Sequence, residues 1–514
     1  MSTRKVIAIG MDAMEASVVE DLLARGSLPH LARLRERGAH GHVVSRPAAF
    51  LSMVWPTFFT AEDVGSHAWY FNKLWDPKRQ TLRYVDNSWL PVRAFWEDLP
   101  EGTRAAVLDV PFSTRPGARF QGTFLNGWQA HDDFGKLEVP SGLHARLRAD
   151  YGSPQMGPEL FGPQDVRTLH RQRKEALGSL EQFARIVAKA VADPYDLVVA
   201  VFGGAHRGGH YLRSLDEADV SGASPEDLAL LSGANDEVYE AADRALGMVL
   251  EAAPSDAVVF AFALHGMGRN RGWAEYLPDI LGHLHAKGEG KPPRRGALYR
   301  LKTSLPFERV RPILMGLPSS VNHALVPIWS RRMLDWSRTR YFALPLDLNG
   351  YLRLNVRDRE ARGIVNPGRE LEEVVAELTR DLLELRDLRD GSPIVSRVLR
   401  VEELVGERAP RRDILPDLIA EWTDSYAHGS HGVGSRYGEV RWSPTAPLPS
   451  GRSGNHTTSG WFVAAGPGVV RGPLPDAIDS KDLAPTLLAW TGGPMPDRFR
   501  GRTIDRLIAG EVVR

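Results

Sequence analysis

The sequence predicts an α/β protein built on a doubly wound, mostly parallel β-sheet, with helical and loop insertions that form a cap. Short apolar runs have the length and composition of buried strands, and each leads into Gly, Asp or His. Between them lie segments with Leu, Ala and Val at helical spacing, such as 177–191 and 236–251. Alternating strands and helices are typical of a doubly wound sheet, whose ligands bind beyond the carboxyl ends of the strands. The predicted strands are 6–10, 105–108, 197–202, 257–263 and 460–465.

Two regions interrupt this alternation. The segment from about 117 to 172 is rich in loop-forming residues. The segment from about 288 to 415 begins basic and proline-containing and continues into a helical stretch at 369–387. We expect both regions to be cap insertions over the sheet's carboxyl edge, within a single domain that spans 1–514.

Composition narrows the classes of function. The 514 residues include 64 Lys+Arg and 64 Asp+Glu, so the formal net charge is zero. A general nucleic-acid or membrane-surface binder would need a positive field, which this balance disfavours. There is no cysteine, so a metal would be held by His, Asp, Glu or a hydroxyl. No apolar run approaches ~20 residues, so we expect no membrane segment and a cytoplasmic protein. We expect its partner to be a small molecule. Its oligomeric state is not predictable.

Two residues near the N-terminus are candidates for chemistry. Asp12 directly follows the first predicted strand, where a metal ligand or a helix N-cap is expected. Ser52 precedes an apolar segment that favours a helix, and a hydroxyl at a helix N-terminus lies in an anion-binding position. A plain N-cap is the alternative for Ser52, and Thr57 is a competing hydroxyl.

Four histidines lie beside predicted strands. His206 and His210 follow strand 197–202 and are four residues apart, a spacing that places two imidazoles on one helical face for a shared metal. His265 follows strand 257–263, and His456 precedes strand 460–465. A lone histidine in a loop usually has no function, but this group together with Asp12 predicts a metal site at one edge of the sheet.

Several motifs follow one another along the chain: Val6-Ile-Ala-Ile-Gly-Met-Asp12, Trp55-Pro-Thr-Phe-Phe-Thr60, Phe262-Ala-Leu-His265-Gly-Met267, Gly454-Asn-His456, and Asp482-Leu-Ala-Pro485-Thr486. A middle segment contains Tyr351-Leu-Arg-Leu-Asn355 and Gly363-Ile-Val365. In this order the motifs resemble those of the alkaline phosphatase superfamily, most closely its type I phosphodiesterase/nucleotide pyrophosphatase branch. The middle segment resembles that of bacterial members described as phosphohydrolases or phosphomutases.

The resemblance implies an alkaline phosphatase-like fold and a site with two zinc ions that bind one phosphoryl group. By position, His206, His210 and His456 would hold the first ion. Asp12, Ser52 and His265 would hold the second, with Ser52 as the nucleophile that attacks phosphorus.

The sequence departs from the family pattern at three of these positions. Leu264 stands where the family has an aspartate, and His206 stands where it has another. Counting back from Trp55 places the nucleophile on Leu51, so the assignment of Ser52 assumes a loop one residue shorter. We therefore expect one or two zinc ions. A site with three histidines and a water molecule has the ligand count of known zinc hydrolases.

The predicted function is metal-dependent hydrolysis of a phosphate ester, as a phosphodiesterase or phosphatase, through a seryl nucleophile or metal-bound water. Arg207 and Arg452 would bind the substrate phosphate, although solvent-exposed arginines are an equal alternative. The other hypothesis is a degenerate or repurposed member with one metal that binds a phosphorylated ligand or performs another metal-assisted reaction. A sulfatase is disfavoured, because the closest match to its motif, Ser45-Arg-Pro47-Ala-Ala49, lacks the required arginine.

Overall fold

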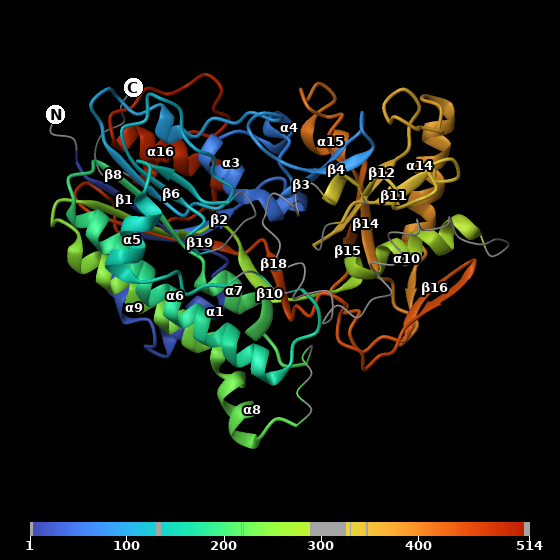
Figure 1. Cartoon of the computed structure of the whole chain (residues 1–514), viewed down its shortest axis with the longest axis horizontal. Helices are drawn as coiled ribbons and strands as arrows, with labels where there is room; N and C mark the ends of the chain where they lie inside the picture. Colours follow the sequence, from blue (N-terminus) through green and yellow to red (C-terminus); the bar gives the residue numbers. More distant parts are fainter. Residues whose placement is uncertain are drawn as a thin grey trace.

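A ten-stranded mixed sheet forms the centre of the computed structural model (Figure 1). The structure describes residues 4–129, 135–157, 159, 161–216, 218, 220, 222–287, 325–328, 330–345 and 348–507. Within that part of the chain the strand order is β20-β2-β19-β9-β1-β8-β5-β6-β7, and β21 also pairs with β2. The bounds are β1 Val6–Met11, β2 Ala39–Val44, β5 Ala105–Leu108, β6 Gly122–Asn126, β7 Leu137–Val139, β8 Leu197–Phe202, β9 Val258–Ala263, β19 Gly460–Ala465, β20 Gly472–Pro473 and β21 Ile478–Asp479.

The middle of the sheet is parallel, as predicted. β1 lies between β8 and β9 and pairs in parallel with both, and β5 continues the parallel order beside β8. Every residue of these strands is buried, which explains their continuous apolar character. The α/β architecture with a parallel centre of the sheet, expected from the sequence, is confirmed.

β19 runs against its neighbours. It is antiparallel to both β9 and β2, with Trp461 opposite Ala263. The start of β19 therefore lies at the same edge as the end of β9. As a result, residues that precede β19 reach the carboxyl edge of the parallel strands, whereas Gly466 and the residues after it lie at the opposite edge.

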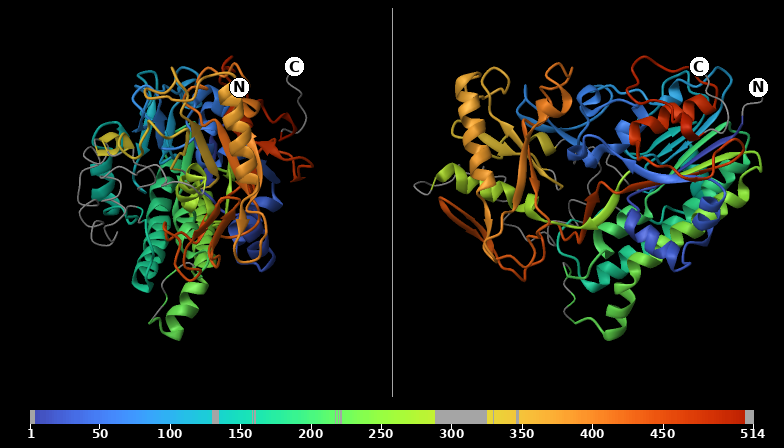
Figure 2. Two further views of the ribbon diagram at one scale, coloured as in Figure 1. Left: turned by 90° about the vertical axis from the view of Figure 1, so that its right-hand side faces the viewer. Right: turned by 180° about the vertical axis from the view of Figure 1, so that it is seen from behind.

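Helices cover both faces of the sheet (Figures 1 and 2). One face packs against α1 (Ala16–Ala24), α2 (Pro29–Glu36), α6 (Val166–Ala192) and α9 (Ala234–Ala252). The other face packs against α3 (Val54–Thr60) and α16 (Leu483–Trp490). No helix in the described ranges combines the length and the apolar character needed to span a bilayer.

A second lobe stands beside the carboxyl edge of the central sheet, at the right of Figure 1. Its four-stranded antiparallel sheet has the order β11-β12-β15-β14 and shares a hydrophobic core with α10 and α14. The bounds are α10 Trp273–Ala286, β11 Tyr341–Ala343, β12 Gly350–Leu354, α14 Arg369–Leu383, β14 Val395–Arg400, α15 Val401–Val405 and β15 Leu418–Trp422. A three-stranded sheet is formed by β13 (Arg386–Asp387), β16 (Gly432–Ser435) and β17 (Gly438–Arg441).

The two segments expected to be caps occupy different places. Of the expected cap at 288–415, residues 288–324 lie outside the described residues. Much of the described part, from 325 to 415, belongs to the second lobe, which also includes α10 before it and β15 to β17 after it. The segment 117–172 instead adds β6 and β7 to the edge of the central sheet, followed by α5 (Leu143–Tyr151). Its remaining loops approach the functional edge, as described below.

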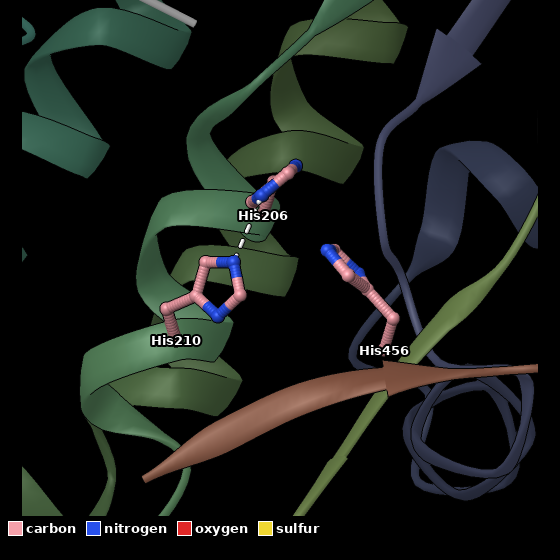
Figure 3. A group of neighbouring side chains, drawn as sticks. All are labelled: His206, His210 and His456. Atoms are coloured by element: carbon pink, nitrogen blue, oxygen red, sulfur yellow. Dashed lines mark hydrogen bonds between the residues drawn. The ribbon is translucent and has the colours of Figure 1, made fainter. Parts of the chain in front are cut away.

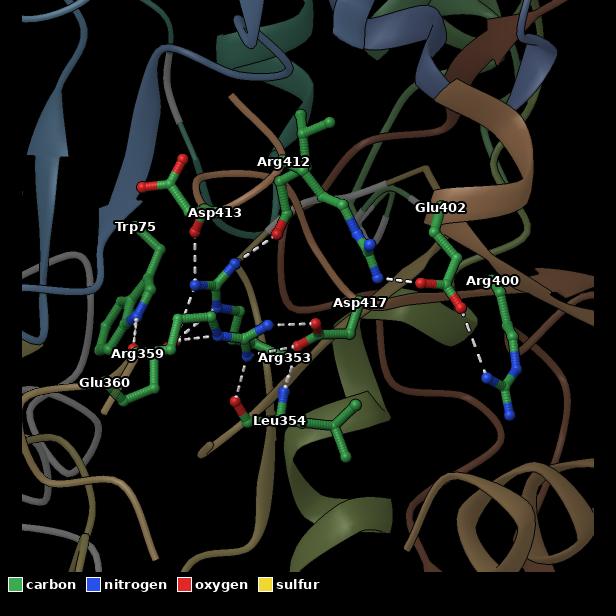
Figure 4. A network of polar contacts seen from close by, with 11 residues as sticks. Trp75, Arg353, Leu354, Arg359, Glu360, Arg400, Glu402, Arg412, Asp413 and Asp417 are labelled. Atoms are coloured by element: carbon green, nitrogen blue, oxygen red, sulfur yellow. Dashed lines mark hydrogen bonds and ion pairs between the residues drawn. The ribbon is translucent and has the colours of Figure 1, made fainter. Parts of the chain in front are cut away.

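A buried ion network joins the second lobe to the hairpin of β3 (Lys73–Asp76) and β4 (Thr81–Tyr84) (Figure 4). The Glu360 carboxylate accepts hydrogen bonds from Trp75 Nε1 at 2.7 Å and from Arg353 Nε at 2.8 Å. The side chains of Arg353 and Glu360 are both 0 % exposed. Arg353 also donates to the carbonyl oxygens of Asp413 and Leu415, so its guanidinium is well satisfied.

Candidate metal centre

The predicted site residues converge at the carboxyl edge of β1, β8 and β9. α7 (Gly204–Leu212) begins directly after β8 and carries His206 and His210 one turn apart. His456 lies in β18 (Gly454–Thr457), which pairs with β10 (Gly266–Arg269), so that His456 is opposite Met267. The ring centroid of His456 is 5.0 Å from that of His206, 5.1 Å from that of His210 and 4.5 Å from that of His265.

His206, His210 and His456 form a group that fits one metal ion (Figure 3). One ring nitrogen from each lies within 4.8 Å of the others, and Nε2 of His206 is 3.0 Å from Nε2 of His210. Two nitrogens bound to one tetrahedral zinc ion are about 3.3 Å apart, given Zn–N bonds of roughly 2.0 Å. Small side-chain adjustments would therefore complete the coordination.

Hydrogen bonds fix the ring orientations of two of these histidines. His210 Nδ1 donates to the carbonyl oxygen of Gly454 at 2.9 Å, and His206 Nδ1 lies 2.5 Å from Asp12 Oδ2. A carbonyl and a carboxylate only accept, so Nδ1 of each ring carries a proton, and in the neutral form that binds a metal Nε2 has the free lone pair. His456 Nδ1 is buried and has no hydrogen-bond partner in the described structure. These lone pairs and the unsatisfied nitrogen suit a cation.

The surroundings keep two of the rings neutral. Burial lowers the pKa of His210 well below its usual value, and the positive charge of Arg452 acts in the same direction. Burial also lowers the pKa of His456 well below its usual value, assisted by His265 and His206. Neutral imidazole is the form that binds a metal, so the group needs little proton release before it can bind one.

Asp12 is buried and holds other side chains in place. Its Oδ1 accepts a hydrogen bond from Trp55 Nε1 at 2.9 Å and lies 3.4 Å from His265 Nε2. Its Oδ2 contacts His206. The carboxylate therefore orients His206 from behind and links His265 to the group. The geometry that brings three histidine nitrogens together does not include Asp12 or His265.

The nucleophile position counted back from Trp55 and the family's aspartate position before His265 are both apolar and buried. Leu51 is 3 % exposed and Leu264 is 1 % exposed, and both belong to the core between the sheet and α3. The backbone of Ser52 lies in the 3₁₀ helix η1 (Ala48–Met53). The side chain of Ser52 lies outside the described part of the structure.

The two arginines expected to bind substrate are both buried. Arg452 Nη2 donates to Glu159 Oε1 at 2.6 Å, and its guanidinium lies over the Phe161 ring at 4.8 Å. Tyr211 Oη also donates to Glu159 Oε1, at 3.2 Å. Sequence reasoning missed Glu159, because it follows no predicted strand and lies in a loop of unrecognised pattern.

A buried amide positions the start of α7, which carries His206 and His210. Gln129 accepts a hydrogen bond from the Gly203 backbone N–H at 3.0 Å and donates to the carbonyl oxygen of Val201 at 2.8 Å. Asp109 in turn accepts hydrogen bonds from the backbone and side chain of Gln129. This chain of contacts fixes the turn from β8 into α7, and with it the direction of His206.

The family comparison matches the same segments. The family described as type I phosphodiesterase / nucleotide pyrophosphatase matches residues 6–433, which include four of the five strands predicted from the sequence. The chain belongs to this family. Membership supports phosphoester hydrolysis as the general activity. A search of curated protein sequences returned no match.

Solved structures show that this phosphodiesterase-family chain has the superfamily fold over nearly its whole length. Murine ectonucleotide pyrophosphatase / phosphodiesterase 5 in complex with AMP is 12% identical, with a TM-score of 0.52, and the match covers 98% of this chain and 100% of that one. Phosphonoacetate hydrolase from Sinorhizobium meliloti, in complex with phosphonoformate, is 15% identical, with a TM-score of 0.50 and 96% of each chain covered. The alkaline phosphatase PafA is 13% identical, with a TM-score of 0.54 and 98% of each chain covered.

Acid should destabilise this phosphodiesterase-family protein through histidines that are buried neutral outside the metal group. Burial lowers the pKa of His67 to about 3, with help from Arg411, and lowers that of His285 to about 4. In the unfolded chain these groups titrate near 6.5, so the unfolded state binds more protons below that pH. These histidines therefore do not lower the free energy of unfolding above about pH 6.5. Below that pH, each lowers it by up to about 1.4 kcal/mol per pH unit.

Urea unfolding curves at about pH 7.5 and 4.5 would measure this loss. We expect roughly 5 kcal/mol from the two histidines together, about two pH units below 6.5. In His285→Gln, the stability lost between these two pH values should be about half as large as in the wild type. An unchanged pH dependence in this variant would show that His285 is not neutral in the folded protein.

Proposed function

We propose that the protein hydrolyses a small phosphate ester at a single zinc ion held by His206, His210 and His456. The observation that carries this proposal is the convergence of three imidazoles, two of which have Nδ1 anchored and Nε2 directed inward. A site with three protein ligands leaves a coordination position open, as catalytic zinc sites do. The AMP complex of the murine relative supports a small phosphorylated molecule as substrate.

When bound, the ion would supply Lewis-acid activation of water and of a phosphoryl oxygen. The residues of the chain would orient the ligands and place charges around the ion. Asp12 fixes His206 and carries the negative charge that balances the centre. His265 lies beside His456, with Nδ1 3.2 Å from the carbonyl oxygen of Gly266 and Nε2 3.4 Å from Asp12 Oδ1. Arg207 and Arg452 place positive charge beside His206 and His210, where a phosphoryl group would bind.

We further propose that water, rather than a side chain, is the nucleophile. Counted back from Trp55, the family's nucleophile position falls on Leu51, whose side chain lies in the core. Ser52→Ala should then retain kcat/KM within about threefold of the wild-type value. A loss of about 10³-fold or more is the size expected when a nucleophile is removed, and would support Ser52 as the nucleophile, as predicted from the sequence.

A second candidate function is binding of a phosphorylated ligand without hydrolysis. The burial of both Leu51 and Leu264 favours it, because two positions that supply a nucleophile and a metal ligand in relatives are apolar here. In this case the protein would bind its ligand with the same histidines but would not turn it over.

Elemental analysis of purified protein, combined with assays of bis(4-nitrophenyl) phosphate and 4-nitrophenyl phosphate, separates the candidates. About one zinc per chain with metal-dependent turnover supports the hydrolase. About one zinc with ligand binding and no turnover of any phosphoester supports the binding protein. About two zinc ions would contradict the single-metal centre, and no zinc after supplementation would contradict both proposals.

A further inference from the structure

Glu159 places a negative charge beside the metal group. Its Oε1 accepts hydrogen bonds from Arg452 Nη2 at 2.6 Å and from Tyr211 Oη at 3.2 Å. Burial opposes ionisation of Glu159, but Arg452, Arg207 and His206 outweigh it and lower its pKa to about 2. The group is therefore a carboxylate at every physiological pH.

Glu159 and His206 face the same small cavity. Its walls are Gln129, Met156, Glu159, Gly203, His206 and Arg207. The cavity has a volume of about 10 Å³, which is room for about one water molecule. Glu159 and a histidine of the proposed metal group therefore border the same space. A phosphoryl oxygen bound close to His206 on this side would meet the Glu159 charge.

Glu159 also changes what the arginines can do. Arg452 is 6 % exposed, and its guanidinium is already paired with Glu159 on one side and stacked on Phe161 on the other. Since the carboxylate cancels one of two nearby positive charges, the arginine pair offers a bound phosphate about one unit of charge rather than two.

We propose that Glu159 is a specificity-determining residue that favours phosphodiester monoanions over phosphomonoester dianions. This inference rests on the proposed function, since it names the substrate class of the same site. A phosphomonoester carries close to two negative charges at neutral pH, because its second pKa is near 6. A phosphodiester carries one. The additional charge of the monoester would be repelled by Glu159 within a poorly hydrated site, where charge interactions are stronger than in water.

The test compares binding of inorganic phosphate and of dimethyl phosphate, measured by calorimetry on the zinc-supplied protein at about pH 8, where phosphate is mostly a dianion. In Glu159→Gln, phosphate should bind about tenfold more tightly or better, while binding of dimethyl phosphate should change much less. Glu159→Ala should give the same result, which keeps the test valid if one of the two variants folds poorly. Glu237→Gln is the matched control, because Glu237 pairs with Arg173 away from the site.

A second measurement uses stability. Removal of Glu159 leaves Arg452 buried without this partner, so the variant should unfold at a lower temperature than the wild type. Added phosphate should then raise its unfolding temperature more than that of the wild type, because phosphate binds the folded state more tightly.

Equal tightening for phosphate and dimethyl phosphate, or no change for either, would overturn the role of Glu159. Binding needs no turnover, so this outcome is separate from failure of the proposed function. The wild type could fail to hydrolyse both bis(4-nitrophenyl) phosphate and 4-nitrophenyl phosphate while both Glu159 variants bind inorganic phosphate more tightly. In that case the proposed hydrolysis is wrong and the role of Glu159 in charge discrimination is supported.

Discussion

His210→Ala should reduce the zinc content from about one ion per chain to nearly none, and should reduce phosphoester turnover by at least about 10³-fold. His210 Nε2 lies 3.0 Å from His206 Nε2, and its Nδ1 is anchored on Gly454. Removal of this ring leaves two histidines, too few for a stable zinc site in a catalytic arrangement. Elemental analysis and an assay with bis(4-nitrophenyl) phosphate measure both effects in the same preparation.

His283→Ala is the matched control for this loss. His283 lies on α10 in the second lobe and contacts Ser435, so its removal should leave zinc content and turnover unchanged. Asp12→Asn should give an intermediate result, with zinc affinity about 10- to 100-fold weaker, because partners behind a metal-binding histidine contribute about that much. Retention of one zinc ion per chain in His210→Ala would rule out the three-histidine centre.

Glu360→Gln should lower the free energy of unfolding by about 3–5 kcal/mol, the usual effect of leaving one partner of a buried ion pair without its counter-charge. Arg353 lies at 2.7 Å from Glu360 with no exposed surface, and Trp75 donates to the other carboxylate oxygen. Urea unfolding followed by tryptophan fluorescence would measure the change, because Trp75 is in contact with the altered group.

Arg397→Gln provides the comparison on the surface. Arg397 pairs with Glu421 on β14 and β15, but its side chain is 63% exposed, so its loss should change stability by less than about 1 kcal/mol. Zinc content should stay at the wild-type level in both variants. A loss below about 1 kcal/mol in Glu360→Gln would mean that the network is hydrated and does not hold the second lobe against the β3–β4 hairpin.

The fold could be predicted because its strands are buried on both faces. The run from Val6 to Met11 is apolar at every position apart from one glycine, and a strand of this kind has few places other than the centre of a parallel sheet. The same run ends next to Asp12, so the edge that carries the site was also predictable. The direction of β19 was not, because an apolar run reads the same in a parallel and an antiparallel position.

The histidines could be placed because each stands next to a strand end, but their partners could not. Asp12 follows the first strand, as predicted, but the contacts of its two oxygens with Trp55 and His206 were not predictable. That arrangement depends on an indole from α3, forty-three residues along the chain. Glu159 was missed because its partner Arg452 lies 293 residues further along the chain, and no local sequence pattern indicates such a pair.

The position of β19 also has a consequence for the order in which the molecule is made. Ribosomal synthesis releases β2, β1, β8 and β9 long before β19, yet β2 has no neighbour on the side of β9 until β19 is inserted between them. His456 is delivered by that same late segment. We therefore expect that the nascent chain holds only two of the three grouped histidines until His456 is made, so that the group could enclose a metal ion only late in biosynthesis. Contacts between residues so far apart in the sequence form slowly. We therefore expect zinc to bind mainly after chain release and to stabilise the completed sheet, rather than to start its formation.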